Sequence, residues 1–451
     1  MSTRRAMVPT LAALGLAELL ALAALGWLPG GLHFPLPGFA LFAVAFGVYL
    51  GAAAWVRASS GASSVGAVTV IWVVAVLLRL ALLPLTPELS DDIYRYLWDG
   101  HVQLAGINPY LFAPAAPELA GIRTAFHHLI NNPAVPTIYP PLAQVAFLGI
   151  AATGSSIVMA KVVWLVCDLA TGWVLARTAR ETGRNEPLVL VLYLWAPLLV
   201  VEVAWSGHLE PLGLLMLALA IRWSHQADRG RRGDEAERES GGGPSGPAAA
   251  VAGVALALSA LTKIAPAAAL PPLVRRHGWK PLVAFVAAVG LLYLPYAAAG
   301  PALFTGLGTY GEHWWFMKGA FGLVEGAVGD PATARTIVGV AVLAVVAWTT
   351  MAGFDLERAL LWILGAGMIL TPTLHPWYVL WMLPMAALRD ARPWIVLGGL
   401  AFIGYFGWSG FHETGSWAQP ALARAALWLP FFALLALDAR RAFSMGRGGA
   451  A

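Results

Sequence analysis

Charged residues are scarce in this sequence. Only 12% of its 451 residues are Asp, Glu, Lys or Arg, whereas 59% are hydrophobic, and the mean hydropathy is +0.71. Soluble domains carry about 25% charged residues, so this composition excludes an ordinary soluble enzyme. Together with repeated apolar runs of about 20 residues, it predicts an all-α, polytopic membrane protein of about twelve to fourteen transmembrane helices.

Other absences narrow the chemistry. Cys167 is the single cysteine, so a disulfide within the chain is excluded. The sequence has no glycine-rich phosphate loop, no Walker motif and no GxSxG element. Asp91 and Asp92 are adjacent rather than spaced as Asp-x-Asp, and the histidines lack ligand spacing apart from His127–His128. We therefore expect no metal and no cofactor, and the scattered basic clusters behind a net charge of +4 do not indicate a nucleic-acid partner.

The apolar runs trace the course of the chain through the bilayer. The first run follows Arg4 and Arg5, is too long for the core of a signal peptide and contains Glu18, so we expect a retained helix. Gly, Pro and charged residues separate the runs. They fall at 7–28, 39–56, 64–86, 138–154, 157–177, 188–204, 210–223, 248–274, 281–298, 334–352, 359–373, 377–388, 394–410 and 420–437.

Lysine and arginine set the orientation. With the N-terminus inside, residues 87–137 become a large outer loop rich in Pro and Asn. If 138–154 crossed the membrane, the arginines of the following loops would lie outside, against the positive-inside rule. We therefore expect 138–154 to lie along the outer surface as a helix started by Pro140–Pro141. The segment 248–274 then makes two short crossings, with Lys263 at the outer turn.

This topology divides the chain into four parts. Residues 1–63 form an N-terminal helical hairpin, and residues 64–223 form a catalytic region with an outer loop at 87–156. The polar, Gly/Ser/Pro-rich stretch 224–247 is predicted to be a flexible cytoplasmic linker. Residues 248–451 are the C-terminal transmembrane region. Since no soluble domain is present, a site must be built from outer loops and helix ends.

Polar and aromatic side chains gather on the predicted outer face. Titratable groups concentrated on one face of a membrane domain indicate a functional site. The candidate site residues are Asp91, Asp92, Arg95, Trp98, Tyr139, His208, Glu210, Lys263, His313, His375 and Trp377.

The stretch LSDDIYRYLWDG holds the densest group of them. In a helix, Asp91, Arg95 and Asp99 share one face, so Arg95 can pair with either acid and keep it ionised. Trp98 adds a flat surface for a sugar. The alternatives are a solvated cluster at a helix start, capped by Ser90, and a Trp98 that anchors the membrane interface.

Three further stretches lie on the same face. WSGHLEP places His208 and Glu210 between two helices, either as a polar turn or as a second acidic element. In LTKIAP, Lys263 either snorkels to water or holds a lipid-linked phosphate. In TPTLHPWYVLWMLP, a proline break and an aromatic cluster place His375 and Trp377 at the wall of a cavity or at the membrane interface.

These motifs, in this order, resemble the polytopic glycosyltransferases of the GT-C superfamily, in the branch of the bacterial polyprenyl-phosphomannose-dependent mannosyltransferases. The resemblance is carried by DDIYRYLWDG, GINPY, YPPLAQ, the His-Leu-Glu turn, LTKIAP and HPWYVLWMLP, and it covers about residues 64–390. The hairpin at 7–56 is an addition to the family pattern. The resemblance implies a GT-C-like fold whose large first extracytoplasmic loop bears juxtamembrane helices.

The resemblance also implies an activity. A hexose, mannose first, would pass from a polyprenyl-phosphate sugar donor to an extracytoplasmic lipid or glycan acceptor by inverting displacement. The enzyme would sit in the bilayer of the bacterial inner membrane, with its site facing the periplasm or cell exterior. The alternative is a transporter or flippase of a lipid-linked saccharide. Transporters usually show internal repeats and charges in mid-membrane, and their absence here favours the enzyme.

Residue roles follow from the same resemblance. Asp91 corresponds to the general base of the superfamily, and Asp92 is the competing candidate. His208 and Glu210 correspond to the acidic element of the second loop. The remaining candidates are expected to bind substrate, and Lys263 and His375 would face the donor phosphate.

Overall fold

The structure, a computed structural model, describes residues 2–28, 35–59, 65–238, 247–407 and 420–448. Every regular element in these ranges is helical, as the sequence predicts, and the described residues form no strand beyond one bridge between Phe316 and Thr373. The helices of the first half are α1 (Ser2–Gly26), α2 (Pro35–Ala58), α3 (Val65–Leu82), α4 (Asp92–Leu104), η2 (Pro117–Ile122), η3 (His127–Leu129), α5 (Pro141–Ala152), α6 (Ile157–Glu181), α7 (Glu186–Leu194), α8 (Pro197–Val200), η4 (Val201–Trp205) and α9 (Glu210–Arg238).

The second half continues with helices that are shorter and more often broken. Proline lies in the first turn of several of them, where its missing N–H has no partner to lose. These elements are α10 (Ala248–Ala260), η5 (Ala265–Ala269), α11 (Leu270–His277), α12 (Lys280–Tyr293), η6 (Leu294–Phe304), α13 (Thr305–His313), α14 (Ala320–Val328), α15 (Pro331–Met351), α16 (Leu356–Leu370), η7 (Pro376–Met382), α17 (Leu383–Arg389), α18 (Arg392–Leu400), η8 (Ala401–Gly404) and α20 (Ala421–Gly448).

Seven helices in the described ranges are long and apolar enough to cross a membrane: α1, α2, α3, α6, the stretch Lys280–His313, α15 and α20. An eighth is added if the bent pair Glu186–Leu194 and Pro197–Trp205, which meet at 50°, is one span. The protein is therefore a multi-pass, all-α membrane protein. The further crossings of the expected twelve to fourteen would have to use shorter segments, and they stay a prediction.

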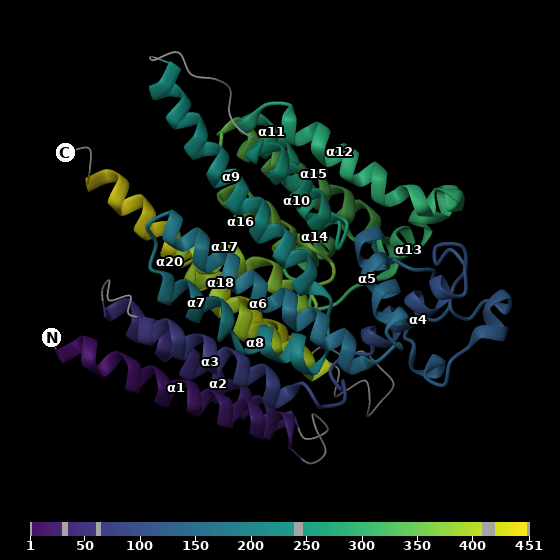
Figure 1. Cartoon of the computed structure of the whole chain (residues 1–451), viewed down its shortest axis with the longest axis horizontal. Coiled ribbons are helices and arrows are strands. Elements are labelled where there is room, and N and C mark those ends of the chain that lie inside the picture. Colours follow the sequence, from purple (N-terminus) through teal and green to yellow (C-terminus); the bar gives the residue numbers. More distant parts are fainter. Residues whose placement is uncertain (1, 29–34, 60–64, 239–246, 408–419, 449–451) are drawn as a thin grey trace.

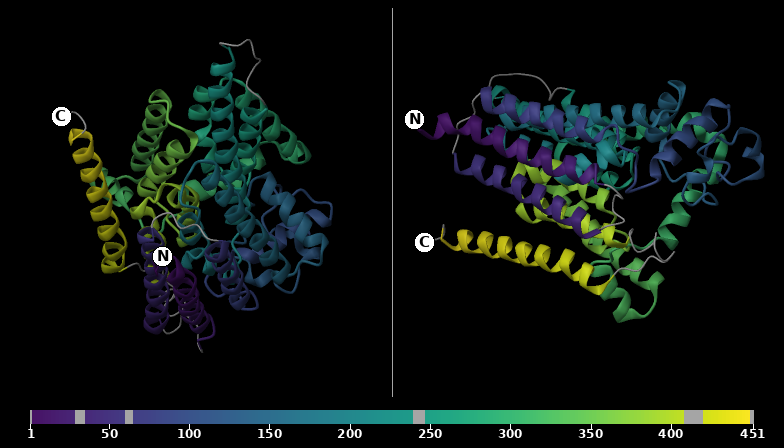
Figure 2. Two further views of the ribbon diagram at one scale, coloured as in Figure 1. Left: turned by 60° about the vertical axis from the view of Figure 1, so that its left-hand side comes forward. Right: turned by 90° about the horizontal axis from the view of Figure 1, so that it is seen from below.

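The helices run side by side, and the two ends of the bundle differ (Figure 1). Both chain termini lie at one end, which we call the terminal end. The helices α4, α5 and α13 lie at the opposite end, which we call the loop end. Figure 2 shows α20, in yellow, along one edge of the bundle.

Two expected features of the chain path appear at the loop end. The segment expected on the outer surface forms α5, whose 12 residues span about 18 Å, too short for a bilayer. The chain after α10 turns at Lys263, which faces the loop end. It then returns to Arg276, whose guanidinium reaches Asp228 and the carbonyl of Gly353 at the terminal end. The segment 248–274 thus runs up and back, as the sequence predicts.

The structure differs from the predicted flexible linker at 224–247. The helix α9 continues through the first part of that stretch to Arg238. Its Ala, Gln, Glu and Arg residues are good helix formers, and their helix propensity outweighs the polar composition that suggested a linker. Residues 239–246 lie outside the described ranges.

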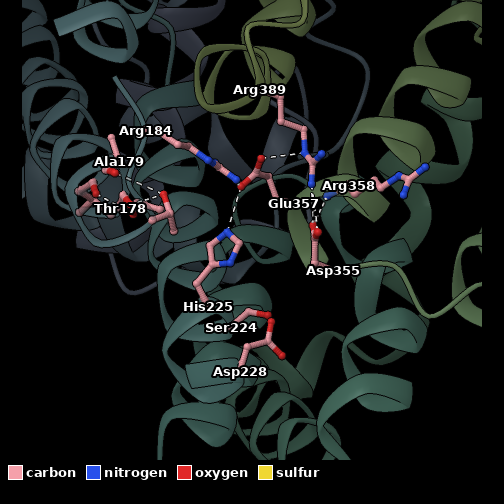
Figure 3. A network of polar contacts seen from close by, with 12 residues as sticks. Thr178, Ala179, Arg184, Ser224, His225, Asp228, Asp355, Glu357, Arg358 and Arg389 are labelled. Carbon is pink, nitrogen blue, oxygen red and sulfur yellow. Dashed lines mark hydrogen bonds and ion pairs between the residues drawn. The ribbon is translucent and has the colours of Figure 1, made fainter. Parts of the chain in front are cut away.

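A polar network ties the helices together at the terminal end (Figure 3). The carboxylate of Glu357, fully buried on α16, accepts hydrogen bonds from Arg184 at 2.7 Å and pairs with His225 at 3.0 Å. Arg389 lies 2.8 Å from its other oxygen and bonds Asp355. A buried carboxylate needs such partners. The network therefore fixes the turn between α6 and α7 against α9, α16 and α17.

Candidate functional site

A cavity of about 640 Å³ lies at the loop end of the bundle. Its walls come from the start of α4, the outer loop around residue 131, the end of α13 and the segment that leads into η7. Eight of the eleven residues singled out in the sequence line it: Asp91, Asp92, Arg95, Tyr139, Lys263, His313, His375 and Trp377.

The paired acids stand at the N-terminus of α4, on the cavity wall. Asp91 is the N-cap residue of α4, rather than Ser90 as the sequence suggests, although the Ser90 hydroxyl accepts a hydrogen bond from the Asp92 amide at 3.2 Å. Asn131 bridges the pair, because its amide nitrogen donates to Asp91 Oδ1 at 3.0 Å and to Asp92 Oδ1 at 2.8 Å. Asn131 comes from the outer loop, 39 positions further on. Its role could not be read from the spacing of the acids.

Burial raises the pKa of both Asp91 and Asp92, and the hydrogen bonds from Asn131 act in the opposite direction. The raised pKa strengthens each carboxylate as a base, since a base is most effective when its pKa lies near the working pH. The amide bridge holds the two neighbouring carboxyl groups in place.

Arg95 pairs with Asp99, at 2.8 Å, rather than with Asp91. The other oxygen of Asp99 accepts hydrogen bonds from Thr137 and Gln144, so three segments meet at this carboxylate. Gly100 lets α4 approach α5 closely, because a Cβ there would lie 2.2 Å from the carbonyl oxygen of Phe147. These contacts anchor the helix that presents the paired acids.

Lys263 faces the acids from the turn after α10. Its ammonium forms an ion pair with Glu210, which is fully buried at the start of α9, and lies 4.7 Å from the centre of the Tyr378 ring. The hydroxyl of Tyr378 in turn hydrogen-bonds that of Tyr310. Lys263 keeps part of its surface exposed to the cavity. It is therefore a cation at the cavity wall, held in position by a buried carboxylate.

Stacked rings form the back wall of the cavity. His375 lies between Phe316, at 4.7 Å, and Trp377, at 4.5 Å, with the rings nearly parallel. Burial, with a smaller effect from Lys263, lowers the pKa of His375 to about 3. Its imidazole is therefore neutral near neutral pH, with a nitrogen able to donate one hydrogen bond.

His208 lies behind this wall rather than in it. Its ring stacks on Trp377 at 4.1 Å and is almost completely buried. Nδ1 is 3.8 Å from Asp92 Oδ2 and 4.0 Å from Glu210 Oε2, and Nε2 is 3.4 Å from Glu202 Oε2. The structure thus brings His208 and Glu210 beneath the paired acids without placing either on the cavity surface.

Glu202 was not singled out from the sequence. It is fully buried in η4, a short π-helix, and accepts a 2.6 Å hydrogen bond from the hydroxyl of Tyr405, which lines the cavity. One signal was available, since a lone glutamate inside the apolar run LLVVEVAW is an indication of function. The π-helix adds a second, because such bulges are frequent at functional sites.

Trp98 lies outside the cavity. It packs in a small core beneath the outer loop with Val102, Leu119 and Ile130, and its ring contacts that of His127. This placement supports neither a sugar contact nor a membrane anchor. Trp98 lies on the buried face of α4, which packs against the outer loop and holds that loop in place.

A second, mostly apolar cavity of about 390 Å³ adjoins the first. The two share Ile138, Tyr139, Lys263, Tyr310 and Tyr378. Beyond these residues its walls are mostly aliphatic, with contributions from the turn after α10, α13, α15 and α16. They include Ile264, Leu307, Ile363, Leu364, Met368 and Leu374.

Comparisons with known proteins indicate the family of the chain. Residues 10–278 match the family described as "Alpha-(1->6)-mannopyranosyltransferase, N-terminal domain". The chain is 27% identical over 382 residues to Alpha-(1->6)-mannopyranosyltransferase B of Corynebacterium glutamicum. That match covers 73% of this chain and 60% of the relative, so the chain spans only part of the relative's length. No solved structure matches the chain. Because the family match covers more than half of the sequence, the chain belongs to the Alpha-(1->6)-mannopyranosyltransferase family.

Proposed function

We propose that this protein transfers mannose from a polyprenyl-phosphate donor to a lipid or glycan acceptor, with inversion at the anomeric carbon. The observation that carries the proposal is the arrangement in one cavity of two carboxylates, a cation and an apolar extension. Family membership supports mannose as the sugar.

The cavity holds a group for each requirement of an inverting displacement, namely a base for the attacking hydroxyl and a cation for the leaving phosphate. Such a reaction needs one base on the acceptor side, and a base must come within about 2.6–3.2 Å of the attacking hydroxyl. Asp91 is the base in this proposal, with Asp92 as the competing candidate. The acceptor oxygen forms a bond to the anomeric carbon, its proton passes to the carboxylate, and the bond from carbon to phosphate breaks.

Lys263 and His375 serve the leaving group. The departing phosphate gains charge in the transition state, and a positioned cation stabilises that charge. Lys263 supplies the cation, while the neutral imidazole of His375 donates a hydrogen bond. Arg95 lines the same cavity but is held by Asp99, so it contributes its charge from a fixed position.

The apolar cavity supplies a place for the lipid. It joins the polar cavity at Lys263, so a phosphate beside that ammonium could extend its isoprenoid chain along Ile264, Leu307 and Met368. Burial of hydrocarbon there is favourable by about 0.8 kcal/mol per CH₂. This geometry favours a lipid-borne donor over a water-soluble one.

The distribution of charge supports a proposed orientation of the bundle in the membrane. The terminal end carries Arg57, Arg184, Arg276 and Arg389, whose side chains form its ion pairs. By the positive-inside rule that end is cytoplasmic, so the cavity faces the periplasm or cell exterior. The protein is then a multi-pass enzyme of the bacterial inner membrane.

A donor panel tests the proposal. The purified protein, reconstituted in vesicles, is given polyprenyl-phosphate mannose, glucose or arabinose with an α-mannoside acceptor, and the products are identified by mass spectrometry. We expect a product one hexose heavier from the mannose donor alone. Movement of the donor across the vesicle membrane without any product would instead indicate a flippase and contradict the proposal.

A further inference from the structure

Glu202, His208 and Glu210 form a buried cluster behind the cavity wall. Several of their polar atoms lack hydrogen-bond partners among the described residues. Within the described part of the chain, neither ring nitrogen of His208 has a hydrogen-bond partner, and neither Glu202 Oε2 nor Glu210 Oε2 has one. All three side chains are buried. Unpaired buried polar atoms cost free energy, so their retention calls for an explanation. Carboxylate oxygens from three different elements lie within 4.0 Å of the ring nitrogens of His208.

The local backbone places His208 here. The π-helix η4 ends at Trp205, and Gly207 follows with a φ of +76°, in the left-handed region that favours glycine. A Cβ at Gly207 would also lie 2.6 Å from the side chain of Ile93 on α4. This turn brings the ring between Asp92 and Glu202, with the backbone N–H of His208 bonded to the Glu202 carbonyl oxygen at 2.9 Å.

The two glutamates near the His208 ring differ in their pairing with cations. Among the described residues, neither Lys nor Arg forms an ion pair with Glu202, whereas Glu210 is paired with Lys263. A fully buried carboxylate without a cation holds its proton, so Glu202 is a donor as well as an acceptor. Tyr405 donates to its Oε1, which leaves the proton on Oε2, the oxygen facing His208 Nε2.

The imidazole itself is neutral, because burial and the charge of Lys263 lower the pKa of His208 well below its usual value. A neutral ring has one N–H and one bare nitrogen. If Nε2 accepts from Glu202, then Nδ1 carries the hydrogen and points at Asp92. The titratable groups that face this ring from all packed elements are Asp92, Glu202, Glu210, Lys263, His375 and Tyr405.

We propose that His208, held in its Nδ1–H tautomer by the protonated carboxyl of Glu202, is a positioning residue that orients Asp92 and keeps it ionised. This inference rests on the proposed function for its catalytic meaning. The separations of 3.4 and 3.8 Å close to hydrogen bonds when the cavity is filled, as catalytic contacts do in many empty sites. Ionisation of Glu202 at alkaline pH reverses the tautomer, turning a bare nitrogen toward Asp92.

The first test reads the tautomer and needs no sugar transfer. Nitrogen-15 NMR of the full-length protein, labelled at histidine, distinguishes Nδ1–H from Nε2–H, and a His208→Asn variant assigns the signal. We expect Nδ1–H near neutral pH, a reversal at alkaline pH, and no reversal in Glu202→Gln, whose amide donates to Nε2 at every pH. An Nε2–H tautomer near neutral pH overturns the proposal, whatever the enzyme transfers.

The second test uses transfer from polyprenyl-phosphate mannose. Glu202→Leu should lower kcat by about 100-fold, because a displacement of a reacting group by about 1 Å costs rate on that scale. The KM for the donor should stay unchanged. Glu202→Gln should keep kcat near neutral pH and lose the alkaline fall in rate. Glu18→Gln is the matched control, because Glu18 is also fully buried but lies on α1, and it should leave the pH profile unchanged.

The outcomes separate the two proposals. An unchanged kcat in Glu202→Leu, or an unchanged alkaline limb in Glu202→Gln, overturns the positioning role while the transferase proposal stands. A wild-type protein that shows the predicted tautomer but transfers no sugar contradicts the proposed function and leaves the arrangement of His208 intact.

Discussion

Replacing Asp91 with Asn is expected to abolish sugar transfer while the protein still folds and binds donor. A general base contributes about 10²- to 10⁴-fold to rate, and an amide of the same shape cannot take the acceptor's proton. Asn131 can still bond the new side chain, so the geometry of the pair is kept. Burial raises the pKa of Asp91, so wild-type activity should fall as pH drops through that raised value, because the protonated acid is no base.

Two further variants complete this experiment. Asp92→Asn distinguishes the competing base. Replacement of the base itself should abolish transfer, whereas replacement of its neighbour, which shares the Asn131 bridge, should lower kcat only by the about 100-fold expected of a misplaced group. Asp330→Asn is a matched control, because Asp330 is an exposed N-cap of α15 and asparagine caps helices equally well. Wild-type rates in both Asp91→Asn and Asp92→Asn would show that the base assignment is wrong.

Lys263→Met is expected to affect stability and transfer together. Glu210 is fully buried, and loss of its partner leaves an uncompensated charge, which costs about 3–5 kcal/mol when a buried pair is broken. The lost cation also removes stabilisation of the departing phosphate, so kcat should fall by about 100-fold or more. Thermal unfolding in detergent and the transfer assay measure the two effects.

A double variant separates these effects. Glu210→Gln in the Lys263→Met background removes the unpaired charge, so it should restore stability but not transfer. If it restored transfer as well, Lys263 would serve only as the partner of Glu210. Lys318→Met is the control, since the Lys318–Glu325 pair is partly exposed and worth about 0–1 kcal/mol.

Sequence patterns predicted most of the architecture because apolar runs report burial in lipid directly. The short α5 and the turn at Lys263 followed from charge placement, which constrains topology even where a helix is too short to be recognised as a span. The helix over the first part of the predicted linker, as far as Arg238, was missed because the composition there is polar, while the local helix propensity continues α9.

The candidate site was predicted through the polarity of its residues rather than their contacts. Asp91 and Lys263 stand out as charges at the ends of apolar runs. Asn131 and Tyr405 do not, because an amide in a polar loop and a tyrosine in an apolar run are ordinary there. Their roles arise only when segments 39 and 203 positions apart meet.

The distinction between cavity and support was also invisible in the sequence. His208 and Trp377 both carry aromatic rings and both lie on the predicted outer face. Trp377 lines the cavity, whereas His208 stacks behind Trp377. Trp98 shows the same limit, since its helical face is buried under the outer loop rather than open to substrate. Periodicity identifies which residues share a face, but not what covers that face.

Transfer on the outer face requires that the paired aspartates open to the outside of the cell. With Cys167 replaced by Ala, a cysteine at the exposed Ala115 in the outer loop reports one side, and a cysteine at the exposed Ala352, between α15 and α16, reports the other. An impermeant thiol reagent applied to intact cells should label Ala115→Cys at once and Ala352→Cys only after lysis. The reverse pattern would place the carboxylates in the cytoplasm and contradict transfer on the outer face.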